Sequence, residues 1–110
     1  MKVIIDASVF TREAGAFGNV SGSIELSCEP RIGDTISFNI ERAGREMPPG
    51  FTGLLRVRNR VLTAGGDPHG PLLELEDINV ESVEDAQALI GYLEQGFKLF
   101  ANVYDENDEP

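Results

Sequence analysis

The chain has 110 residues, of which 41% are hydrophobic and 25% charged, and its formal net charge is −10. Length and composition are those of a single globular domain, which we place at residues 1–104, with an acidic frayed tail at 105–110. No apolar run approaches the roughly 20 residues that a membrane helix needs, so we expect no membrane insertion.

The charge is distributed unevenly along the chain. Residues 1–63 carry eight Lys or Arg against seven Asp or Glu, a balance of +1, whereas residues 64–110 carry one Lys against twelve acids, a balance of −11. An acidic field repels phosphate backbones, so we expect no nucleic-acid partner. The acidic half either keeps the protein soluble or docks onto a basic partner.

The cysteine content and the N-terminus indicate the compartment. A single cysteine, Cys28, excludes an internal disulfide and fits a reducing environment. The first ten residues lack the long uncharged core of a signal peptide, because an aspartate stands at position 6. We therefore expect a cytoplasmic protein and take a bacterial cell as its setting.

Period-two alternation predicts the first strands. Residues 2–10 alternate as a first strand, and 11–22 form a loop or a hairpin that turns near Ala14 and Gly15. A second strand follows, with Val20, Ile24, Leu26 and Cys28 on one side, so Cys28 is predicted to be buried. A turn at 29–34 leads into a third strand, with Ile36, Phe38 and Ile40 inward. The polar, proline-ending stretch 42–50 reads as a loop.

The stretch 51–80 predicts a central antiparallel hairpin. Leu55, Val57 and Val61 alternate with arginines, Leu73 and Leu75 alternate with glutamates, and the glycine-rich segment 63–70 separates them. Pairing Val61 with Leu73 places Arg60 opposite Glu74 and Arg58 opposite Glu76. A bulge near Asp77, or the end of the strand, explains why Ile78 and Val80 fall out of phase.

One helix and a last strand complete the prediction. Ser82 is a good N-cap for a helix over about 82–95, and Gly96 fits the position after its end. Residues 97–104 alternate as a strand that pairs with the first one. The alternative is a helix that continues through Phe100.

The chain offers little that resembles a catalytic or metal site. His69, the only histidine, and Asp67 lie in a glycine-rich turn that would not preorganise them, and two ligands are too few for a metal. No nucleophile elbow, phosphate loop or paired-cysteine motif is present. We therefore predict no catalytic residues, no metal, no cofactor and no enzymatic activity.

The row Arg56, Arg58 and Arg60 is the densest positive charge in the chain. Guanidinium groups match phosphates and carboxylates, so this row, with Asn19 and Ser21, is the candidate binding site for a small anionic ligand such as a nucleotide or an acidic metabolite. The competing interpretation is cross-strand pairing with Glu74 and Glu76, which alone would account for the row.

Four stretches, 19–26, 31–38, 55–62 and 73–78, followed by a short helix, resemble a PilZ domain in their turns and alternation. The resemblance covers about residues 19–95. It implies a small antiparallel barrel and binding of the messenger cyclic di-guanylate. The family's RxxxR pair should precede the first strands, but only Arg12 lies before residue 30. Ile24 stands where the second motif, otherwise met at Asn19 and Ser21, requires glycine. The resemblance therefore implies a degenerate member.

Together these patterns predict an α+β, mainly β domain. It has an antiparallel barrel or a strongly curved sheet of five or six strands, with one helix. For function they predict a non-catalytic interaction module that binds a protein partner or self-associates, through a strand edge or the acidic half. The alternative is a PilZ-like receptor for a small anion.

Overall fold

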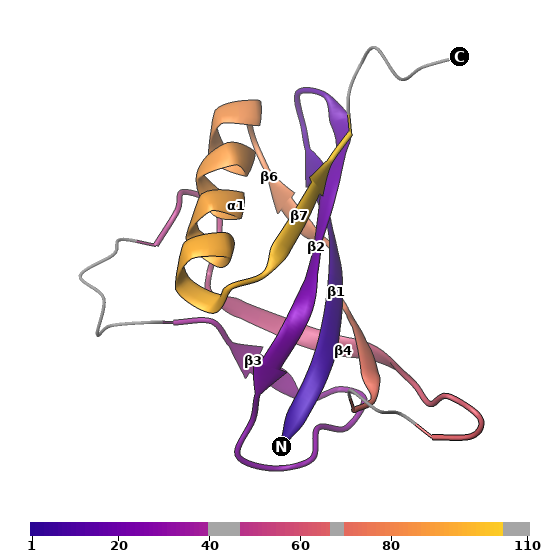
Figure 1. Ribbon diagram of the computed structural model, residues 1–110. Coiled ribbons are helices and arrows are strands. Elements are labelled where there is room, and N and C mark those ends of the chain that lie inside the picture. Colours follow the sequence, from indigo (N-terminus) through magenta and orange to yellow (C-terminus); the bar gives the residue numbers. More distant parts are fainter. Residues whose placement is uncertain (40–46, 67–69, 105–110) are drawn as a thin grey trace.

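The computed structural model describes residues 1–39, 47–66 and 70–104 (Figure 1). Within these ranges the chain forms one mixed sheet of seven strands and a single helix, which confirms the mainly β fold. In chain order the elements are β1 (Lys2–Thr11), β2 (Gly15–Glu25), β3 (Thr35–Ser37), β4 (Leu54–Val61), β5 (Leu72–Leu75), β6 (Ile78–Val80), α1 (Val83–Phe97) and β7 (Phe100–Val103).

The sheet is open rather than closed into a barrel. Its strand order is β3-β4-β5-β1-β2-β7, and β6 also pairs with β1. The long strand β1 lies at the centre, with β5 and β6 running parallel to successive parts of it. The break between β5 and β6, at Glu76 and Asp77, is the predicted irregularity near Asp77. It lets the chain change from one part of β1 to the next.

The first hairpin turns where the glycine spacing predicts. Thr11 pairs with Gly15, and the Thr11 hydroxyl oxygen accepts a hydrogen bond from the backbone N–H of Ala14 at 2.8 Å. A bulge at Phe17 shifts the register between β1 and β2. The second strand ends at Glu25, so the prediction that Cys28 continues its buried row is wrong: the thiol is exposed.

The central antiparallel hairpin of β4 and β5 is confirmed, but its predicted register is wrong. A bulge at Arg58 lets Val57 pair with Leu75 and Asn59 with Glu74, after which Val61 pairs with Leu72 instead of Leu73. The extra residue inverts the alternation beyond it. Val61 is therefore exposed, and Arg60 is in register with the buried Leu73.

Helix α1 runs from Val83 to Phe97. Ser82 caps it, accepting a hydrogen bond from the N–H of Asp85 at 3.1 Å, as the sequence predicts. It ends later than predicted, because the left-handed residue that terminates it is Lys98, with φ of 57°, and not Gly96. The chain then enters β7, which confirms the strand prediction near 97–104. Its partner is β2, not β1.

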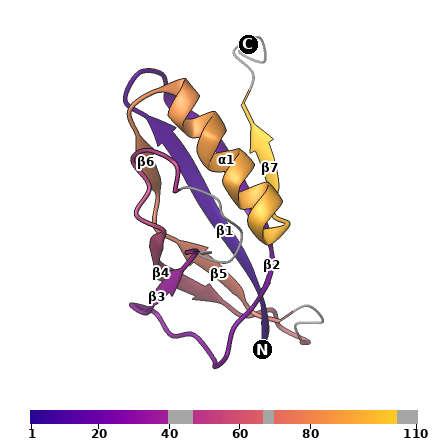
Figure 2. The same ribbon diagram turned by 90° about the vertical axis from the view of Figure 1, so that its left-hand side faces the viewer.

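The helix covers one face of β1 and β2, which we call the inner face (Figure 2). The inward residues Val3, Ile5, Ala7 and Val9 of β1 are all at most 2% exposed. Burying one aliphatic side chain of the size of Val or Ile contributes roughly 1.5–3 kcal/mol. The opposite, outer face carries the polar residues of the same strands.

An aromatic cluster joins α1 to the segment around β3. The rings of Phe38 and Phe97 are 5.1 Å apart, edge to face, and Tyr92 lies between Phe97 and Phe51. The Tyr92 hydroxyl donates a hydrogen bond to the carbonyl of Phe38 at 2.5 Å. Residues 40–46 lie outside the described residues, so the predicted inward position of Ile40 does too.

Candidate functional site

The five predicted ligand-binding residues lie on two separate parts of the sheet. Asn19 and Ser21 are on β2, and the three arginines are on β4, with β5 and β1 between the two strands. Adjacent strands lie about 4.8 Å apart, so three strand spacings separate the two groups by roughly 14 Å. The backbone of Asn19 and Ser21 is therefore well separated from that of the arginines.

The arginines do not converge on one point. Arg58 forms an ion pair with Asp77 at 3.4 Å, and Arg60 forms one with Glu29, so neither takes the predicted partner, Glu76 or Glu74. The bulge at Arg58 is the reason, because it turns Arg60 toward the inner side of the sheet. Arg58 and Arg60 therefore lie on different sides of β4 and pair with different carboxylates.

Arg56 remains on the exposed side of β4. Its backbone N–H donates to the Glu76 carboxylate at 2.8 Å, and its backbone carbonyl accepts from the N–H of Glu76 at 2.9 Å. Glu76 thus binds the main chain of Arg56 and fixes the end of the β4–β5 ladder.

A small polar hollow lies on the outer face. It has a volume of about 90 Å³ and is lined by Asp6, Ser8, Arg58, Asn59, Glu74, Leu75 and Asp77. Asn19 reaches its border, donating from its side-chain amide to Asp6 at 2.9 Å. Three carboxylates against one arginine make the hollow acidic, and this charge opposes an anionic ligand.

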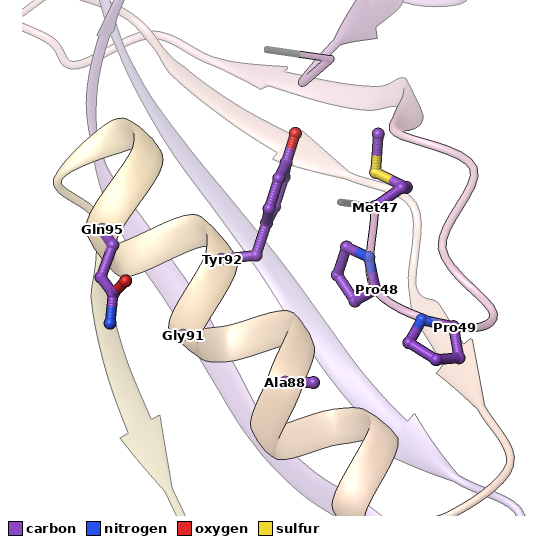
Figure 3. Close-up of a pocket in the computed structure, with 7 residues that line it drawn as sticks. All are labelled: Met47, Pro48, Pro49, Ala88, Gly91, Tyr92 and Gln95. Carbon is purple, nitrogen blue, oxygen red and sulfur yellow. The ribbon is translucent and has the colours of Figure 1, made fainter. Parts of the chain in front are cut away.

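A larger groove of about 450 Å³ separates α1 from the segment 47–49 (Figure 3). Ala88, Gly91, Tyr92 and Gln95 line it from the helix, and Met47, Pro48 and Pro49 from the other side. Because Ala88 and Gly91 have small side chains, the helix surface leaves room for the groove, and Pro48 and Pro49 form its opposite wall.

The third feature is β7, at the end of the sheet. Its ladder to β2 pairs Asn102 with Asn19 and Ala101 with Val20, and the N–H of Tyr104 donates to the carbonyl of Phe17 at 2.9 Å. Hydrogen bonding alternates along an antiparallel strand. The backbone groups of residues 100, 102 and 104 therefore face β2, and those of Ala101 and Val103 face away from it.

The side chains of β7 and the next residue are unusually apolar for an edge. Phe100 is 76% exposed, Val103 50% and Tyr104 49%. Phe100 lies on the outer face, where it pairs with Ser21, and Ala101 lies on the inner face, where it pairs with the buried Val20. Figure 2 shows β7 at the margin of the sheet, with α1 in front of the sheet and not beyond that margin.

This edge strand and the residue before it pack closely against two glycines of β2. A Cβ atom at Gly18 would overlap the carbonyl oxygen of Asn102, and one at Gly22 would lie 2.9 Å from the Leu99 side chain. Gly18 needs the absence of a side chain because it faces backbone atoms of β7, whereas at Gly22 the nearest atom is the end of the Leu99 side chain, which can shift. The glycines are visible in the sequence as interruptions of a strand pattern, which is the signal for a close backbone approach.

The described residues contain no group of three or more His, Cys, Asp and Glu side chains that could hold a metal ion. The pair of Asp67 and His69 lies outside the described ranges. In the part of the chain that is described, no helix has the length and apolar character to cross a membrane.

Comparisons of this chain with family models, with curated proteins and with solved structures found no match. The resemblance to PilZ domains therefore stays a prediction.

Proposed function

We propose that this protein is a non-catalytic interaction module that takes up a strand of a protein partner, or of a second copy, at the edge of β7 that faces away from β2, which is unpaired among the described residues. The observation that carries the proposal is the combination of outward-facing backbone groups at Ala101 and Val103 with exposed apolar side chains around them. An added strand would satisfy the backbone groups, and flanking side chains would give it selectivity.

The character of this edge supports the proposal. Proteins commonly protect a strand edge with prolines, bulges or inward-pointing charges. The strand sequence, FANV, has none of these, and its shortness, four residues, is the one protection that β7 itself shows. Exposed Phe and Tyr are also the residue types that interfaces favour.

Proline substitution at Ala101 tests the proposal. Its N–H faces away from β2, so a proline keeps the β2–β7 ladder while removing a donor from the free edge. The matched control is Ser37→Pro on β3. The N–H of Phe38 donates to the carbonyl of Gly53 at 2.6 Å, so the neighbouring Ser37 N–H faces away from β4.

We expect the wild type and Ser37→Pro to retain the same proteins from an extract of the source cell, or to self-associate equally in sedimentation, and Ala101→Pro to do neither. Thermal melts of all three check that the fold survives. Retention and sedimentation that are equal for wild type and Ala101→Pro would refute the proposal. Repeating the retention at high salt separates strand addition from docking through the acidic half.

The alternative prediction, a receptor for a small anion, would use Arg56, Arg58 and Arg60 with Asn19 and Ser21. The separation of these residues and the acidic hollow between them give it no support from the geometry. A thermal-shift panel of nucleotides and acidic metabolites tests it, because a ligand that binds only the folded state raises the melting temperature.

A further inference from the structure

We infer that the strand added at β7 is β7 of a second copy, paired antiparallel about a two-fold axis through Asn102. This inference rests on the proposed function and names its partner. The axis is perpendicular to the sheet, so it joins two sheets edge to edge and keeps both helices on the same face. An interface of this kind is isologous: each contact occurs twice.

The hydrogen-bonding phase selects the register. Only Ala101 and Val103 of β7 turn their backbone groups outward. Leu99, the next residue in that phase, donates its N–H to the carbonyl of Leu93 at 3.5 Å and is buried. Pairing Ala101 with Val103 of the second copy, and the reverse, is the antiparallel register that uses both outward residues of each chain.

This register matches side chains on both faces. On the outer face, Phe100 lies opposite Tyr104 of the second copy, at two equivalent places. These are non-hydrogen-bonded pairs, in which Cα atoms approach to roughly 4.5 Å and side chains pack closely. Cross-strand aromatic pairs contribute about 0.2–1 kcal/mol each. On the inner face, Ala101 lies opposite Val103, so the exposed apolar side chains of both copies meet.

The interface is small. A strand of four residues buries much less than the roughly 1,600 Å² of a standard interface, so the expected dimer is weak and its population depends on concentration.

A disulfide tests the register directly. Asn102 lies opposite itself across the two-fold axis, at a Cα separation of roughly 4.5 Å that a disulfide can bridge. The variant Asn102→Cys is made in a Cys28→Ser background, because the exposed Cys28 would form dimers of its own. Ser23→Cys, an exposed outer-face position on β2 beyond the end of β7, is the matched control.

Under mild oxidation we expect Asn102→Cys to give a covalent dimer on a non-reducing gel, with Ser23→Cys remaining mainly monomeric. Equal dimer yields from the two variants would overturn the register.

Placing charged residues at the two aromatic positions gives a second, independent test of the dimer. A chain with Phe100→Lys and Tyr104→Lys places Lys opposite Lys, and a chain with Phe100→Glu and Tyr104→Glu places Glu opposite Glu. We expect each to sediment as a monomer, and an equimolar mixture to form a heterodimer. A mixture that stays monomeric, with the wild type also monomeric at every concentration, would overturn the inference. If Ala101→Pro still lost a cellular partner in that case, the proposed function would stand without the dimer.

Discussion

The two ends of the sheet, β3 and β7, have the same backbone pattern and opposite side chains. In each, two residues turn their backbone groups outward: Thr35 and Ser37 in β3, Ala101 and Val103 in β7. The exposed side chains of β3 are Thr and Ser, and its aromatic neighbour Phe38 is buried. At β7 the aromatic residue, Phe100, is the exposed one. An open ladder is thus common to both ends. Leu54 of β4, opposite Ser37, is also exposed, but only in β7 are large exposed apolar side chains carried by the edge strand itself.

The largest effect on stability should come from removing Phe38, the buried aromatic residue next to β3. Phe38 is 1% exposed and packs on Phe97, so Phe38→Ala should lower the free energy of unfolding by about 3–5 kcal/mol. Urea denaturation measures the change. A loss below about 1 kcal/mol would show that this aromatic cluster is not part of the core.

A smaller effect should follow from filling the space under β7. In Gly18→Ala the added methyl group overlaps the carbonyl of Asn102, which should cost about 1–3 kcal/mol and expose the amides of residues 102 and 104 to exchange. The control is Gly91→Ala on α1, where the methyl group meets open space. That change should stabilise the protein by up to about 1 kcal/mol. If both substitutions lowered the free energy of unfolding, the cost of Gly18→Ala could not be assigned to the close contact between Gly18 and β7.

The smallest effect on stability should come from Phe100→Ser. The ring is 76% exposed, so the free energy of unfolding should change by no more than about 0.5 kcal/mol. Self-association measured by sedimentation should nevertheless be lost, because both aromatic cross-strand pairs disappear. An unchanged sedimentation profile would show that the Phe100 side chain has no role in association at this edge.

Local patterns in the sequence predict most of the elements and few of their long-range pairings. Alternation finds β1, β2 and the β4–β5 hairpin, and the Ser82 cap finds the start of α1, because these depend on neighbouring residues. The parallel pairing of β5 with β1 joins segments far apart in the chain, and no local pattern encodes it.

Errors arise where a pattern is extended past an irregularity. The bulge at Arg58 inverts the phase of β4, so Val61 and Arg60 exchange the sides that strict alternation assigns to them. Cys28 keeps the phase of β2 but follows its last residue, Glu25, and is therefore exposed. In the candidate ligand site the same bulge separates the arginines.

The free edge of β7 could be anticipated only in part. The sequence predicts a strand near 97–104, and its apolar residues are visible. Which backbone groups face outward depends on the pairing with β2, because the bond from Tyr104 to Phe17 sets the hydrogen-bonding phase. That pairing depends on Gly18 and Gly22, whose role becomes clear only when β7 is placed beside them.

Amide hydrogen exchange at β7, followed residue by residue as a function of protein concentration, tests the central claim most directly. In dilute solution the amides of Ala101 and Val103 should exchange fast and those of Asn102 and Tyr104 slowly, because only the second pair faces β2. In concentrated solution all four should be protected. Slow exchange of Ala101 and Val103 in dilute solution, or fast exchange at every concentration, would contradict the account.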